Sequence, residues 1–108
     1  MAITRNHQAE YTHWRPEETK LIEGVPVRFR DVCVHTIRLG DVEDPELYAA
    51  QPLSDFLKTE KGQWLEQHSK EQMIYNVGPC PETYGWRVWV SAFLEEEDLT
   101  YFQLRWSN

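Results

Sequence analysis

Two runs of aromatic and β-branched residues near the end of the chain constrain the fold more than any other feature. The first covers residues 86–94 and the second covers residues 99–106, and an acidic segment at 95–98 separates them. Such residues suit the pleated, half-buried surface of a sheet, and a short polar connection between two such runs is typical of a β-hairpin. The sequence therefore predicts that the chain ends in an antiparallel hairpin with the acidic segment as its loop. A four-residue loop and a bulged three-residue loop pair the two runs differently, so the register stays open.

Both faces of this predicted hairpin carry apolar side chains. Successive side chains of a strand point to opposite faces, so Val88 and Val90 share one face while Trp89 and Phe93 share the other. One amphipathic helix can cover only one of these faces. The other face requires either a cover from the N-terminal segment or a partner, and aromatic and arginine side chains concentrate binding energy at interfaces. The candidate interface residues are Arg87, Trp89, Phe93, Tyr101 and Arg105.

The segments before the hairpin predict one long strand or a bent pair of strands, then a helical region and a short strand. Residues 25–39 alternate as a strand does, with a break or bulge expected at Asp31, and residues 73–77 form a second strand. Asp44 is a good helix cap for a short helix at 45–50, and Pro52 then separates it from the main helix at roughly 53–70. Gly62 marks either a close approach to the sheet or a break in that helix. The fold class is therefore α+β: a mostly antiparallel sheet of about four strands, in the order β-α-β-β-β, with one main helix on one face.

The first 24 residues show weak patterning. We interpret residues 1–24 as an N-terminal arm with at most one short strand, and residues 25–108 as a single domain. Tyr11 and Trp14 are poor choices for a solvated tail, so we expect the arm to pack on the body of the domain. In this interpretation the arm covers the second face of the hairpin.

Composition and charge exclude several functional classes. The chain has 108 residues, 41% hydrophobic and 27% charged, and no apolar run approaches the ~20 residues that span a bilayer. The N-terminus lacks the apolar stretch of a signal peptide, so we expect a cytoplasmic protein with free cysteines. The net charge is −7 and the acidic excess lies in residues 41–108, which disfavours direct binding to nucleic acid and favours solubility or a basic protein partner.

The residues that could carry chemistry are few. Cys33 and His35 are expected on one strand face, and Cys80 in its Gly/Pro loop could add a third metal ligand or a nucleophile. The pattern lacks a Cys-x-x-Cys pair and an evident fourth ligand, so free thiols are the favoured interpretation and we expect no cofactor. The arginines at 28, 30 and 38 share one strand phase and are expected to face solvent, and no nucleotide-binding motif is present.

One resemblance concerns residues 39–50, Leu-Gly-Asp-Val-Glu-Asp-Pro-Glu-Leu-Tyr-Ala-Ala, and residues 58–64, Lys-Thr-Glu-Lys-Gly-Gln-Trp. These two segments resemble small proteins of the bacteriophage type. The resemblance implies no fold, activity or site residue. It favours a phage accessory or virion-associated role.

Taken together, these features predict a non-enzymatic protein-interaction or assembly module that acts through the aromatic hairpin, with a protein partner or a second copy of the chain. A small metal- or thiol-dependent enzyme using Cys33, His35 and Cys80 is the first alternative. An acidic decoy that occupies the nucleic-acid site of a basic enzyme is the second.

Overall fold

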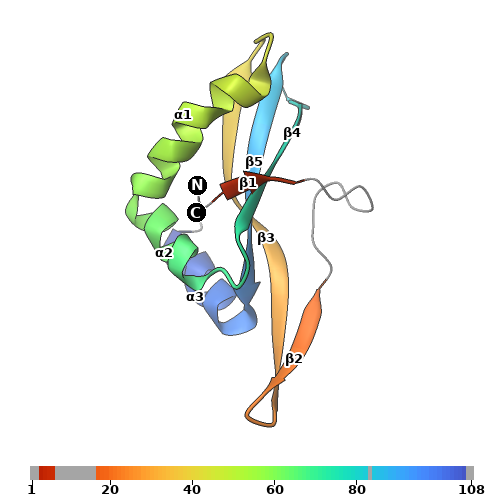
Figure 1. The fold of residues 1–108 in the computed structure, drawn as a ribbon, viewed down its shortest axis with the longest axis vertical. Helices are drawn as coiled ribbons and strands as arrows, with labels where there is room; N and C mark the ends of the chain where they lie inside the picture. Colours follow the sequence, from red (N-terminus) through yellow and green to blue (C-terminus); the bar gives the residue numbers. More distant parts are fainter. Residues whose placement is uncertain (1–2, 7–16, 83, 107–108) are drawn as a thin grey trace.

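The computed structural model describes residues 3–6, 17–82 and 84–106, and shows a five-stranded sheet with three helices (Figure 1). The elements in chain order are β1 (Ile3–Arg5), β2 (Glu18–Ile22), β3 (Val25–Gly40), α1 (Pro45–Lys58), α2 (Glu60–His68), β4 (Met73–Pro79), β5 (Trp86–Glu95) and α3 (Glu96–Trp106). The α+β class and the largely antiparallel sheet are confirmed, but the number of helices and the order of elements differ from the prediction.

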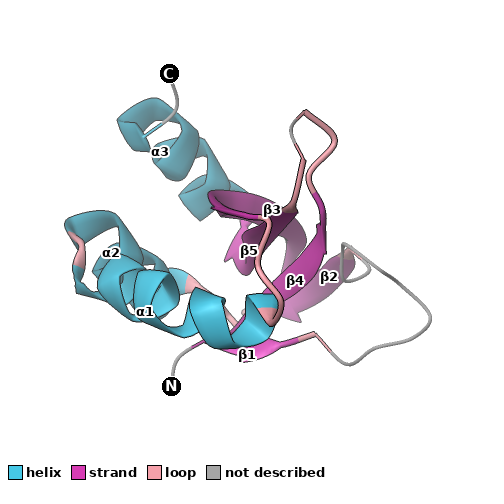
Figure 2. Cartoon of the chain, turned by 90° about the horizontal axis from the view of Figure 1, so that it is seen from above, coloured by secondary structure: helices cyan, strands magenta, loops and turns pink. Residues whose placement is uncertain are grey.

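The strands lie in the order β1-β4-β5-β3-β2, with β5 in the centre. Every neighbouring pair is antiparallel except β1 and β4, which are parallel. The three helices cover one face of this sheet, as the view from above shows (Figure 2). Both edge strands, β1 and β2, come from the predicted N-terminal arm. The expected cover by Tyr11 and Trp14 lies outside the described residues.

The predicted C-terminal hairpin is wrong, because residues 96–106 form helix α3 directly after β5. A strand there would have to pair with β5, but β3 and β4 already occupy the two edges of β5. The acidic residues Glu96, Glu97 and Asp98 fill the first turn of α3, where negative charge interacts favourably with the helix dipole. Leu99 and Phe102 are buried one turn apart, so the second aromatic run follows a helical period.

The helical region is also divided differently from the prediction. Helix α1 continues through Pro52, and the helical region is interrupted at Thr59, between α1 and α2. The Thr59 hydroxyl donates to the carbonyl of Phe56 at 2.6 Å and accepts from the amide of Gly62 at 3.0 Å, so one side chain ends α1 and caps α2. A Cβ atom at Gly62 would collide with the Phe56 carbonyl, which explains the glycine at this break. The cap at Asp44 is confirmed, since its carboxylate accepts from the amide of Leu47 at 3.2 Å.

Strand β3 contains the expected irregularity, displaced from Asp31 to the interval between Cys33 and His35. The bulge changes the phase of the alternation, so that Val34 and Ile37 both belong to the helix-facing side of the sheet. This shift keeps apolar residues on the core side both before the bulge, at Val32, and after it, at Ile37 and Leu39.

Strand β5 is buried on both faces from Val88 to Leu94. Its even-numbered residues pack against the helices in the main core, as the alternation predicts. The helices contribute their buried stripes to the same core. The helical members are Ala49, Leu53, Phe56, Leu65, Leu99 and Phe102.

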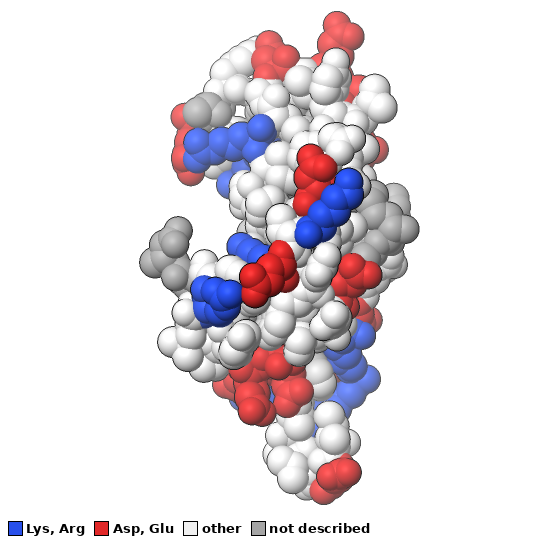
Figure 3. Space-filling view, turned by 90° about the vertical axis from the view of Figure 1, so that its left-hand side faces the viewer, with Lys and Arg blue, Asp and Glu red and all other residues white. Residues whose placement is uncertain are grey.

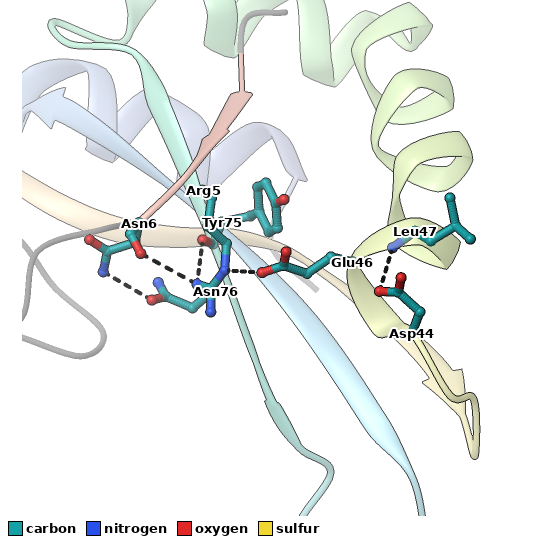
Figure 4. Close-up of polar contacts among 7 residues, drawn as sticks. All are labelled: Arg5, Asn6, Asp44, Glu46, Leu47, Tyr75 and Asn76. Atoms are coloured by element: carbon teal, nitrogen blue, oxygen red, sulfur yellow. Dashed lines mark hydrogen bonds and ion pairs between the residues drawn. The ribbon is translucent and has the colours of Figure 1, made fainter.

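Polar contacts fasten β1 to both the helical layer and its neighbouring strand (Figure 4). The Nε atom of Arg5 lies 2.6 Å from the carboxylate of Glu46 at the start of α1. The side-chain amide of Asn6 donates to the Oδ1 atom of Asn76 on β4 at 2.9 Å. These bonds hold a three-residue strand whose pairing alone would be marginal.

Core burial predicts unequal effects for two leucines of α1. Leu53 is 1% exposed and Leu47 is 68% exposed, so Leu53→Ala leaves a cavity while Leu47→Ala does not. We expect Leu53→Ala to lower the free energy of unfolding by about 2–5 kcal/mol and Leu47→Ala to change it by less than about 0.5 kcal/mol. Urea denaturation of both variants measures this, and equal losses would contradict the described packing of α1.

Candidate functional site

Two of the predicted interface residues on β5 are buried. Trp89 is 9% exposed and Phe93 is 1% exposed. The Trp89 ring lies against Gly78 of β4, where a Cβ atom would come within 3.0 Å of the indole, and Arg87 lies over the same ring at 4.9 Å. Phe93 stacks with Phe29 of β3 at 6.0 Å between ring centres. These rings fill the second face of the sheet, so any docking surface of this subunit must use other side chains.

Of the other three, Arg87 is partly buried on β5, while Tyr101 and Arg105 lie on α3 and remain exposed. Tyr101 is 50% exposed and neighbours Leu104, which is 82% exposed. Their spacing of three and four residues makes Tyr101, Leu104 and Arg105 neighbours on the exposed side of α3. The helix therefore separates Tyr101 and Arg105 from Trp89 and Phe93, which a hairpin would have kept adjacent.

Tyr101 belongs to a group of stacked rings that joins α2 to α3. The ring of Trp64 lies in the middle, 4.1 Å from His68, 5.2 Å from Tyr101 and 5.3 Å from Trp106. Phe102 lies beneath, 5.7 Å from Trp106. We call these five residues, Trp64, His68, Tyr101, Phe102 and Trp106, the α2–α3 aromatic cluster.

Cations border the α2–α3 aromatic cluster. The ammonium of Lys61 lies 5.3 Å from the centre of the Phe102 ring, and the guanidinium of Arg105 lies 5.2 Å from that of Trp106. Arg105 also pairs with Glu60 of α2 at 3.0 Å. Cation–π contacts and the ion pair hold the two helices in register while leaving Tyr101 and Leu104 accessible.

Sequence reasoning did not assign Trp64, His68 or Trp106 to this surface. One signal was available, because Trp64 and His68 are one helical turn apart, and the imidazole Nδ1 atom lies 2.8 Å from the Trp64 carbonyl. The position of α3 beside α2 could not be predicted, because residues 96–106 were expected to form a strand of the hairpin instead of a helix.

The structure does not bring Cys33, His35 and Cys80 together on one surface. Cys33 lies opposite Ser91 on β5 whereas His35 lies opposite Val90, and adjacent residues of β5 point to opposite faces. The predicted placement of Cys33 and His35 on one face is therefore wrong, because the bulge inserts a residue between them. Cys80 is buried directly after β4, whereas Cys33 is partly buried on β3. Among the described residues, no three His, Cys, Asp or Glu side chains group as a metal site would require.

His35 instead contributes to the core on the helical side of the sheet. Its ring stacks on Phe56 at 4.2 Å with an interplanar angle of 10°. Burial, and secondarily the positive charge of Lys61, lowers the pKa of His35 below its ordinary value. Burial also lowers the pKa of Lys61.

The three arginines of β3 that share one strand phase are each close to a glutamate. Arg28 and Arg30 lie 3.2 Å and 3.9 Å from the carboxylate of Glu17, and Arg38 lies 2.5 Å from Glu82. On the helical side of the molecule, charged side chains occur in small groups separated by uncharged surface (Figure 3). None of the helices in the described ranges is both long and apolar enough to cross a bilayer.

No family model, no curated protein and no solved structure matches this chain. The phage accessory or virion-associated role therefore stays a prediction, as does the role of an acidic decoy.

The environment of His35 predicts how stability depends on pH. Since its pKa is lower in the folded protein, the unfolded chain binds a proton first as the pH falls below about 6.5, and stability is lost in that interval. Replacing His35 by Gln removes this loss. We expect the stability difference between the wild type and His35→Gln to be larger at pH 7.5 than at pH 5.5.

Urea denaturation at the two pH values measures this difference, and NMR titration of the imidazole protons checks the direction of the pKa shift. An identical difference at both pH values would show that His35 is not held neutral by its surroundings.

Proposed function

We propose that this chain is a non-enzymatic protein-interaction or assembly module whose docking surface comprises the α2–α3 aromatic cluster and the adjacent side chains Leu104 and Arg105. The observation that carries the proposal is the exposure of Tyr101 and Leu104, 50% and 82%, beside a stacked set of aromatic rings. A small domain gains nothing in core stability from a leucine left in water. Tyr, Trp and Arg are the residue types that dominate binding energy at protein interfaces.

The rigidity of this surface supports the same conclusion. Trp64 contacts four other rings, and the pairing of Arg105 with Glu60 fixes α3 against α2. A preorganised aromatic surface loses little side-chain entropy when a partner binds. The half-exposed rings of Trp64 and Trp106 would provide the central contacts, and the charged side chains at the border would form a polar rim.

The enzyme alternative has less support from the geometry. The bulge in β3 directs the Cys33 and His35 side chains to opposite faces of the sheet. Cys80 is buried directly after β4, near the start of β5. Zinc analysis of the purified protein tests this alternative directly. About one zinc per chain, lost in Cys33→Ser with the fold retained, would favour the enzyme over the interaction module.

Site-specific photo-crosslinking in cells that naturally produce the chain tests the proposed surface. A photoreactive phenylalanine analogue replaces Tyr101 on α3 in one protein and Tyr48 on α1 in the control, because the two tyrosines are similarly exposed, 50% and 57%. We expect a defined protein adduct at position 101 that is absent at position 48. The adduct partner, once purified, should bind the wild-type chain and lose roughly tenfold or more in affinity with Leu104→Glu.

The variant Leu47→Glu serves as the matched control, since Leu47 is also an exposed leucine on a helix, 68% against 82% for Leu104. Equal crosslinking at positions 48 and 101, or equal loss of affinity in both glutamate variants, would contradict an interface at α2 and α3.

A further inference from the structure

The edge formed by β2 is a second accessible surface, separate from the α2–α3 aromatic cluster. Strand β2 is the outermost strand of the sheet beside β3, and residues 19–22 are all exposed. With the first part of β3 it forms a ribbon that extends beyond the body of the domain (Figure 1). The end of this ribbon carries exposed aliphatic side chains, Leu21 at 75%, Ile22 at 47% and Val25 at 59%. Figure 3 shows the same projecting end as largely uncharged.

The turn of the ribbon determines which backbone groups point outward. Ile22 lies opposite Val25, so the turn consists of two residues, Glu23 and Gly24, both with positive φ. The pair that flanks such a turn exchanges backbone hydrogen bonds, and hydrogen-bonded pairs alternate with non-bonded pairs along the ribbon. The N–H and C=O groups of Leu21 and Thr19 therefore point away from β3, toward solvent. They form the template onto which another strand can add.

The two long sides of the ribbon are not equivalent. On the β3 side, pairing with β5 begins only at Phe29, which leaves residues 25–28 without β5 beside them. Pro26 lies there opposite Leu21, at a position where an N–H would point outward, so this side lacks one of the donors that an added strand needs. Strand β2, Glu-Thr-Lys-Leu-Ile, contains no proline. The β2 side is therefore the receptive edge.

The charged residues of β2 favour a second copy of β2 as the added strand, and they favour one register of the pair. In an antiparallel pair of two β2 strands related by a twofold axis at Thr19, Glu18 of one copy lies opposite Lys20 of the other, and the same pair occurs twice. A twofold axis at Lys20 places two lysines opposite each other, and an axis at Leu21 pairs Lys20 with Ile22. Opposite charges directly across two strands stabilise the pairing and like charges destabilise it. The register at Thr19 also pairs the outward backbone groups of the two threonines.

We propose that β2 pairs with β2 of a second copy of this chain, antiparallel and centred on Thr19, so that one sheet continues through a homodimer. Glu18 is available for this contact, because its present partners Lys20 and Lys70 lie at 3.4 Å on a surface open to solvent. The dimer uses the edge of the sheet and leaves the α2–α3 aromatic cluster free for a different protein.

Charge reversal tests the pairing. Glu18→Lys places lysines at both positions of the pair, and Lys20→Glu places glutamates at both. We expect each variant alone to dimerise roughly tenfold or more weakly than the wild type, in analytical ultracentrifugation over a range of concentrations. An equal mixture of the two variants restores opposite charges at every contact, so native mass spectrometry should detect the mixed dimer at close to wild-type abundance. Circular dichroism of each variant confirms that the fold is retained.

Two further variants separate this dimer from other associations. Thr19→Pro removes an outward N–H and should abolish the dimer, whereas Lys58→Glu, the same charge change at an exposed site on α1, should leave it unchanged. Leu104→Glu should also leave it unchanged, since that residue belongs to the other surface. A wild-type chain that stays monomeric to about 1 mM, or a dimer that is equally sensitive to Lys58→Glu and Lys20→Glu, would overturn the proposal. A dimer disrupted by Leu104→Glu but not by Thr19→Pro would overturn the β2 pairing and support the surface at α2 and α3.

Discussion

The burial of β5 on both of its faces is the constraint on which the rest of this structure depends. Every side chain of β5 from residue 88 to residue 94 is buried, and all of them except Ser91 are apolar, so the strand requires a cover on each side. On one side the three helices provide that cover and form the main core. On the other side Trp89 lies against the glycine of β4 and Phe93 stacks on Phe29. Because β5 also pairs along both edges, the chain that follows it cannot return as a strand and leaves the sheet as a helix.

This change of direction at Glu95 decides where the accessible aromatic residues lie. The aromatic residues of the last quarter divide into two groups with different roles. Those of β5 stabilise the sheet, and those of α3 join the single tryptophan of α2 in the α2–α3 aromatic cluster. The excess of aromatic residues that first suggested a binding surface is thus partly a requirement of the fold. What remains for binding is the smaller exposed set around Tyr101 and Leu104.

The two candidate surfaces differ in their charged side chains and in whether they expose backbone hydrogen-bonding groups. The cations Lys61 and Arg105 contact rings of the α2–α3 aromatic cluster, so positive charge borders this cluster on a chain of net charge −7. The ribbon of β2 and β3 combines aliphatic side chains with an open row of backbone groups, which is a surface suited to strand pairing rather than to side-chain docking. The two proposed contacts, a homodimer at β2 and a different protein at the α2–α3 aromatic cluster, therefore use separate parts of the molecule.

The sequence by itself determined the strand at residues 86–94, the extent of the long strand β3, the cap at Asp44 and the excess of aromatic residues. These features follow from local periodicity and from hydrogen bonds within a few residues, which do not depend on the rest of the chain. The tertiary structure alone decided that residues 96–106 are helical, that Cys33 and His35 face opposite sides of the sheet, and that Tyr101 is exposed while Trp89 is buried. The eleven residues of α3 carry apolar side chains at positions 99, 102 and 106, which fits a helical period, while their residue types also suit a strand. The choice between helix and strand therefore depends on whether β5 has a free edge. Both edges of β5 are occupied by strands distant in sequence, so the segment is helical.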